Sequence, residues 1–183
     1  MACVVAGMSW RPELVVDEIP APRKMAPYAL ALSADVVVAG AELGSGRLVL
    51  LHDPDGNPSW DGDHRCVAYV RANIEYELAA DPLLTDVGWS WLTDALAREN
   101  AAHRAPGGTV TAVSNKSFGM IEDDLPTWQV EIRASWTPEL DEPDDIAAHL
   151  RAWSDLLCEA AGLPPLPPGV IPLARRRSGA WGL

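Results

Sequence analysis

Strict alternation of apolar and polar side chains is the feature that most constrains how this chain folds. Between positions 128 and 136 every second residue is apolar, in the order Trp128, Val130, Ile132, Ala134 and Trp136. The residues between them are Gln129, Glu131, Arg133 and Ser135. Successive side chains of a strand point to opposite faces of its sheet, so this pattern predicts a strand with one buried face. Positions 28–38 repeat the pattern and predict a second such strand.

Three further segments have strand character. RLVLLH, at 47–52, is expected to form a hairpin with 28–38 through the glycine-rich turn GAELGSG at 40–46. Positions 66–75 also alternate, although Val67, Val70 and Ile74 fit a helical stripe as an alternative. A short strand is expected at 109–114, and positions 115–126 are expected to form a loop.

Two helices are predicted from their start signals and apolar spacing. Asp81-Pro82 combines a capping carboxylate with proline at the first helical position, and the helix is expected to fade near His103. The second helix is expected to begin at Pro143, beside Asp144 and Asp145, and to end before Gly162.

The element order is therefore β-β-β-α-β-β-α. Short connections favour an antiparallel sheet of about five strands, and we expect an α+β fold with the helices packed on one face. Residues 28–162 are expected to form a single domain. Residues 1–27 are expected to be an irregular lead-in because of Pro20, Pro22 and Pro27, and residues 163–183 a flexible proline-rich tail.

The charge of the chain excludes several classes of partner. The formal net charge is -12, which repels the phosphates of nucleic acids and the surface of anionic membranes. No apolar run is long enough to span a membrane. The three cysteines, Cys3, Cys66 and Cys158, form no CxxC pair and are expected to be reduced thiols. We therefore expect a cytoplasmic protein that binds neither nucleic acid nor membrane.

The loop HDPDGNPSWDGDH, from His52 to His64, has the composition of a metal site. Read as a calcium loop that begins at Asp53, it places Pro58 where glycine is needed and His64 where a bidentate glutamate is needed. Its Asp-Pro, Asp-Gly and Asn-Pro pairs are ordinary turn dipeptides. We expect a hairpin loop and no metal ligand in it.

Catalytic patterns are weak. GWSWL, at 88–92, differs from a nucleophile elbow at Leu92 and does not follow a strand, so Ser90 is not expected to be a nucleophile. The glycines around 40–46 match neither phosphate-binding motif. No two histidines have the spacing of metal ligands on a helix, and His149 is expected in packing or at the surface. We expect no catalytic residue and no cofactor.

The tryptophans carry the most specific predictions. Trp128, Trp136 and Trp153 lie on the inward faces of predicted elements and are expected in the core. Trp89 lies off the apolar stripe of its helix, and Trp60 lies in the polar loop. Because exposed tryptophans often anchor interfaces, we expect Trp60 and Trp89 to contribute to a binding surface.

Four long strings resemble an actinobacterial family known as domain of unknown function 3000: PELVVDEIPAPRKMAPYALALSADV, GRLVLLHDP, ADPLLTDVGWSWLTDAL and EIRASWTP. The resemblance covers roughly 11–165. It implies no activity, cofactor or site residue.

These observations lead to an expected function. We expect a non-catalytic protein-interaction or regulatory module. Its partner is an unknown protein or a second copy of the chain in a homodimer. The alternative is a small-molecule-binding or enzymatic domain that uses the sheet face and the loop at 44–46.

Overall fold

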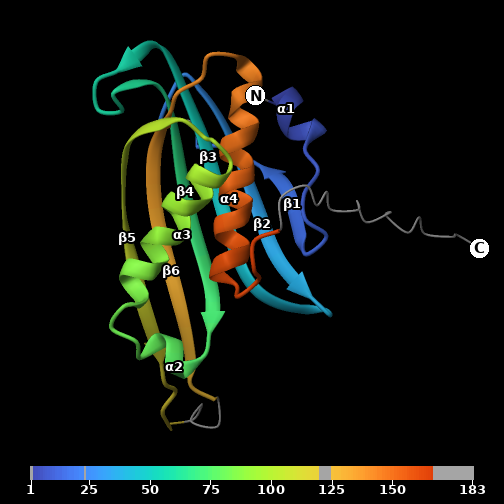
Figure 1. The fold of residues 1–183 in the computed structure, drawn as a ribbon, viewed down its shortest axis with the longest axis vertical. Coiled ribbons are helices and arrows are strands. Elements are labelled where there is room, and N and C mark those ends of the chain that lie inside the picture. Colours follow the sequence, from blue (N-terminus) through green and yellow to red (C-terminus); the bar gives the residue numbers. More distant parts are fainter. Residues whose placement is uncertain (1, 23, 120–124, 167–183) are drawn as a thin grey trace, which may run out of the picture.

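One antiparallel sheet of six strands forms the body of the molecule. The computed structural model describes residues 2–22, 24–119 and 125–166. The strand order is β1-β2-β3-β4-β6-β5. The strands are β1 (Leu14–Ile19), β2 (Tyr28–Val38), β3 (Ala41–Asn57), β4 (Gly62–Ile74), β5 (His103–Asn115) and β6 (Thr127–Pro138). The helices are α1 (Ala2–Gly7), α2 (Tyr76–Ala79), α3 (Leu84–Arg98) and α4 (Ile146–Ala160), with a 3-10 turn η2 (Pro143–Asp145) before α4 (Figure 1).

The mixed composition of helices and a single antiparallel sheet is confirmed, but the expected strand count of about five is wrong. The additional strand is β1, which lies in the segment expected to be an irregular lead-in. It pairs with β2 from Leu14↔Val36 to Ile19↔Ala31. The prolines at 20, 22 and 27 lie outside β1 and β2, so they end one strand and precede the next rather than preventing both.

The glycine-rich segment at 40–46 is not the expected seven-residue turn. The reversal uses only Ala39 and Gly40, both with positive φ, and β3 begins at Ala41. Gly46 lies in this strand beneath α4, where an added Cβ would lie 3.3 Å from the Leu157 side chain. The glycine therefore permits close packing of a helix on the sheet rather than a change of chain direction.

The alternating segment 66–75 belongs to a strand, β4. Strands β3 and β4 extend beyond the predicted segments 47–52 and 66–75. They pair along Gly44↔Ala72 to His52↔His64, and only residues 58–61 form the turn between them. The hairpin loop expected from the turn dipeptides is thus present but shorter than the quoted stretch.

Strand β5 is longer than the predicted segment 109–114, because the preceding helix α3 ends at Arg98 rather than near His103. Pro106 and Gly107 are compatible with this strand for two reasons. It lies at the edge of the sheet, and its pairing with β6 shifts register between Arg104 and Gly107.

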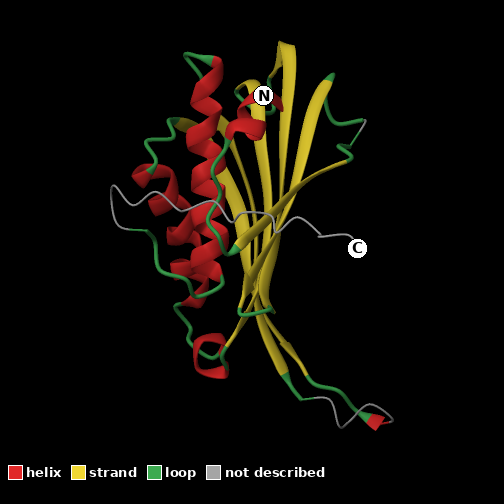
Figure 2. Cartoon of the chain, turned by 90° about the vertical axis from the view of Figure 1, so that its right-hand side faces the viewer, coloured by secondary structure: helices red, strands yellow, loops and turns green. Residues whose placement is uncertain are grey.

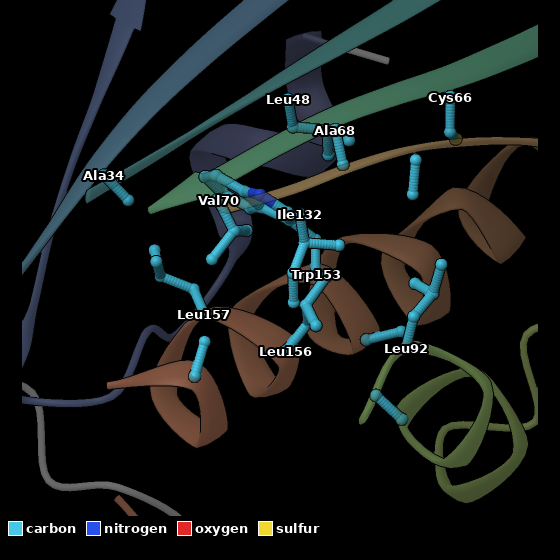
Figure 3. Packing of buried hydrophobic residues seen from close by; sticks show 14 of the residues in the cluster. Ala34, Leu48, Cys66, Ala68, Val70, Leu92, Ile132, Trp153, Leu156 and Leu157 are labelled. Carbon is cyan, nitrogen blue, oxygen red and sulfur yellow. The ribbon is translucent and has the colours of Figure 1, made fainter. Parts of the chain in front are cut away.

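The largest helices, α3 and α4, lie together on one side of the sheet (Figure 2). Ion pairs from Arg98 of α3 to Asp155 and Glu159 of α4 join them. Side chains of α4, including Trp153 and Leu157, face Val70 and Ile132 of the sheet (Figure 3). Burying this apolar surface is the main force that holds the layers together.

The tryptophan predictions are met in part. Trp136 and Trp153 are fully buried, whereas Trp128 is half-buried and packs edge-on against Tyr76. Trp153 packs edge-on against Trp10, with ring centroids 6.2 Å apart.

No helix within the described residues is long and apolar enough to cross a membrane. Most of the predicted proline-rich tail, residues 167–183, lies outside the described residues, so its flexibility stays a prediction.

Candidate functional site

Alternation along the strands gives the sheet two different faces. The buried residues of β4 and β6, such as Val70 and Ile132, point toward the helices. Their neighbours in sequence therefore point to the other side. We call that side the open face, and define it by Arg47, Val49, Leu51, Arg65, Val67, Tyr69, Arg71, Glu131, Arg133 and Ser135.

A hollow of about 660 Å³ lies on the open face over β3, β4, β6 and β5. Val49 and Val67 form an apolar floor, and the side chains of Arg47 and Arg133 also line the hollow. Strand register explains this arrangement, because Tyr69 lies directly opposite Arg47 on one neighbouring strand and Arg133 on the other.

A second hollow of about 500 Å³ adjoins the first and shares Val67 and Ser135 with it. Trp60, Met25 and Arg65 contribute to its walls. The two hollows together make a trough that runs along β4 from Tyr69 toward the β3–β4 turn.

Tyr69 is held in position by its neighbours. Its hydroxyl donates to Oε1 of Glu131 at 3.0 Å, and the Arg133 guanidinium lies 5.3 Å from its ring centroid. Arg133 also donates to Oε2 of Glu131 at 2.9 Å. Burial and the bond to Glu131 raise the pKa of Tyr69, so the phenol stays neutral and donating at physiological pH.

The arginines of the open face differ in how they are used. Arg65 donates to Ala105 O, Thr137 Oγ1 and Ser135 Oγ, all neutral acceptors. Arg47 and Arg71 are exposed, and within the described residues neither forms an ion pair. Two guanidinium groups are thus available to a ligand at the open face.

This local positive charge stands out against a chain of net charge -12. The residues that define the open face include four arginines and one carboxylate, Glu131, and two further carboxylates, Asp17 of β1 and Asp35 of β2, lie on the same side of the sheet. Such a surface attracts anionic groups, and the forked guanidinium of arginine suits carboxylates and phosphates.

The structure does not bring Trp60 and Trp89 together. Trp60 is half-buried and lines the trough on the open face. Trp89 is half-buried on α3 and contacts Gly108 of β5 from the helix side of the sheet. The two indoles belong to opposite sides of the molecule, and a binding role for either stays a prediction.

The other residues considered in the sequence lie in ordinary surroundings, with one exception. Ser90 lies within α3 and donates to Val87 O, and buried His149 accepts a hydrogen bond from Trp136 Nε1 at 3.1 Å. In the polar hairpin, Asp53 and Asn57 accept backbone N–H bonds from Asp55 and Ser59, as in local turns. The exception is His52, which the sheet register places opposite His64.

Sequence reasoning missed Arg47, Tyr69 and Arg133. In the sequence each was assigned only to a predicted strand: Arg47 to 47–52, Tyr69 to 66–75 and Arg133 to 128–136. Their assembly into one row depends on the register of three strands, two of which are far apart in the chain. Only the placement of β6 beside β4, across α3 and β5, could reveal it.

The fold and the open face define an α+β protein whose single antiparallel sheet carries helices on one side and a cationic trough on the other. The family described as protein of unknown function (DUF3000) matches residues 3–171, and the chain belongs to that family. No curated protein and no solved structure matches it.

Proposed function

We propose that the protein is a non-catalytic binding module that uses the trough of the open face to hold an acidic segment of a partner protein. The observation that carries the proposal is the row Arg47–Tyr69–Arg133 beside an apolar floor, within a strongly acidic chain. Carboxylates of the partner would bond Arg47, which lines the trough, and Arg71, which lies beside it on the open face, and an apolar side chain would lie on Val49 and Val67.

The chemistry of the trough supports binding rather than catalysis. The residues that line its larger hollow include no histidine, cysteine or carboxylate. The phenol of Tyr69 donates a hydrogen bond to Glu131, and its pKa is raised, which disfavours the ionised form. General acid–base catalysis near neutral pH needs groups that titrate there, and within this hollow the side chains offer none.

The second candidate is a small anionic ligand. The volume of about 660 Å³ lies within the range of small-molecule pockets. Such a ligand would use the same arginines, so it differs from a peptide in size rather than in recognition.

A selection of random peptides tests the proposal. Peptides displayed on phage would be selected on the wild-type protein alone, and the enriched peptides would then be measured on the double variant Arg47→Glu/Arg71→Glu. We expect enrichment of acidic peptides that contain an apolar residue, with affinity for the double variant reduced at least about tenfold, because attraction becomes repulsion at two positions.

Arg151→Ala is the matched control, since Arg151 is an arginine of α4 that pairs with Glu99 on the helix side. It should bind the selected peptides like the wild type. Absence of enriched peptides, or equal binding to both proteins, would contradict the proposal. Tighter binding of single-stranded RNA than of any peptide would instead assign the trough to nucleic acid.

We further propose that the protein works in the cytoplasm, on the support of the buried free thiols Cys66 and Cys158.

A homodimer through two open faces is disfavoured, since it would bring arginines against arginines. Self-association, if it occurs, should use another surface. Sedimentation in the analytical ultracentrifuge should then give the same oligomeric state for the wild type and the double variant.

A further inference from the structure

A group of metal-ligating side chains lies outside the trough, at the end of the β3–β4 pair. His52, Asp63 and His64 each offer one ligand atom, and these atoms all lie within 4.8 Å of one another. Among the described residues this is the one such group of histidine, cysteine or acidic side chains. It was missed in the sequence, where His52 and His64 stand at opposite ends of a loop.

Strand pairing fixes the two histidines. His52 and His64 are directly opposite in the antiparallel register, as the pair that follows Leu51↔Arg65. Their rings stack with centroids 4.1 Å apart and an interplanar angle of 20°. Because both residues lie on paired strands rather than in the turn, their backbone positions are set before any ligand arrives.

One polar atom of the group lacks a hydrogen-bond partner, whereas Asp63 and His64 pair with each other. Nδ1 of His52 is buried and has no hydrogen-bond partner. Asp63 Oδ1 lies 2.9 Å from His64 Nδ1, so the carboxylate is already directed toward the histidine pair. A buried imidazole nitrogen without a partner is costly, and a bound ion would remove that cost.

The surroundings favour a cation. Asp53, Asp55 and Asp61 lie in the same hairpin, and within the described residues none of them pairs with a lysine or arginine. His64 is 18 % exposed and Asp63 58 % exposed at the side chain, so an ion can reach the group from solvent.

The donor set selects the kind of ion. Two imidazole nitrogens and one carboxylate suit zinc and similar transition ions, whereas calcium and magnesium prefer all-oxygen sites. Zinc binds nitrogen and oxygen donors at about 2.0–2.2 Å, which needs donor atoms about 3.3 Å apart. The donors lie within 4.8 Å of one another, and the two stacked imidazole rings would have to turn out of their stack for both nitrogens to reach that spacing.

We propose that His52, Asp63 and His64 form a Zn²⁺ site at the turn end of the β3–β4 hairpin. Three protein ligands leave the fourth tetrahedral position to water. This proposal replaces the expectation that the hairpin binds no divalent ion. It differs from the calcium interpretation of that sequence in both residues and ion. It is independent of the trough, because His52 and His64 continue the helix-facing rows of Leu50 and Cys66.

Titration of the metal-free protein with Zn²⁺, followed by calorimetry, tests the site. We expect one ion per chain, a thermal unfolding midpoint that rises with Zn²⁺ concentration, and no saturable binding of Ca²⁺ at the same concentrations. His52→Gln, His64→Gln and Asp63→Asn should each weaken Zn²⁺ binding at least about tenfold.

Two variants serve as matched controls. Asp55→Asn removes a carboxylate of the same hairpin, and His103→Gln removes a histidine whose Nδ1 already pairs with Ala101 O. Both should bind Zn²⁺ as the wild type does. Absence of saturable binding to the wild type, or equal losses in the controls, would overturn the assignment.

A measurement on the unaltered chain covers the case in which a variant fails to fold. Long-range ¹H–¹⁵N spectra resolve the nitrogens of His52, His64, His103 and His149. Zn²⁺ should shift the nitrogens of His52 and His64 and leave those of the other two unchanged. Shifts confined to His103 or His149, or no shift at saturating Zn²⁺, would exclude the site.

Discussion

Burial changes the pKa values of single residues in the core of this protein, and His149 of α4 is the clearest case. Its Nδ1 accepts a hydrogen bond from Trp136 Nε1, so the imidazole must be neutral there. Burial, assisted by nearby His103 and opposed by Asp145, lowers the pKa of His149 to about 4.

This shift predicts a loss of stability in mild acid. The unfolded chain takes up a proton near pH 6.5, whereas the folded chain resists it until about pH 4. The free energy of unfolding should therefore fall as the pH drops through this window, by up to roughly 3 kcal/mol. Urea unfolding at several pH values measures it. His149→Gln has no titrating group at this position, so its free energy of unfolding should fall by less over the same pH window, the difference being that amount. An equal fall in the two proteins would contradict the prediction.

Within the elements, close contacts of backbone with backbone decide which substitutions are tolerated. Gly108 of β5 is an example, because an added Cβ would lie 2.2 Å from Arg133 O and 2.9 Å from the Trp89 ring. Gly107 beside it has nothing within 4 Å of the same added atom.

We expect Gly108→Ala to destabilise the protein by about 2–3 kcal/mol, because β5 must move away from the backbone of β6 and Trp89 must also shift. Gly107→Ala is the matched control and should change the free energy of unfolding by less than about 0.5 kcal/mol. Chemical denaturation of both variants checks this. A similar cost for the two would show that the contact at Gly108 is readily relieved.

The contacts between helix and sheet depend on buried aromatic volume. Trp153 of α4 has no exposed surface, whereas Trp128 of β6 is half-buried. Trp153→Ala should cost about 3–5 kcal/mol, and Trp128→Ala clearly less, because solvent already reaches part of its indole. Thermal unfolding of the two variants measures the difference, and equal losses would contradict it.

At the scale of the whole molecule, the thiols report on the integrity of the single core. Cys66 of β4 and Cys158 of α4 are fully buried, and burial raises the pKa of Cys158 to about 12 and raises that of Cys66 as well. The reactive thiolate is therefore suppressed at both positions.

In a Cys3→Ser background, we expect neither thiol of the folded protein to react with a disulfide reagent faster than the chain unfolds. Both should react at once in concentrated guanidinium chloride. Because the thiols belong to different layers of one core, their labelling rates should match each other and the rate of global unfolding. Rapid labelling of one thiol alone would show that its layer opens separately.

The sequence by itself determined the elements with a strong period. Alternation at 28–38 and at 128–136 defined β2 and β6, and the apolar spacing after Pro143 defined α4. These patterns are local, since each records which side of one element is buried. Weaker signals gave wrong predictions. The prolines that follow β1 led to the prediction of an irregular segment there, and Gly46 led to the prediction of a turn although it allows close packing of α4.

Only the tertiary structure decided which of these residues meet. The row Arg47–Tyr69–Arg133 and the pair His52–His64 both depend on strand register. Register is set by the cooperative burial of one sheet face against α3 and α4 rather than by any short stretch of sequence. A shift by one residue would send each of these side chains to the other face, so the trough and the metal ligands exist only in the folded sheet.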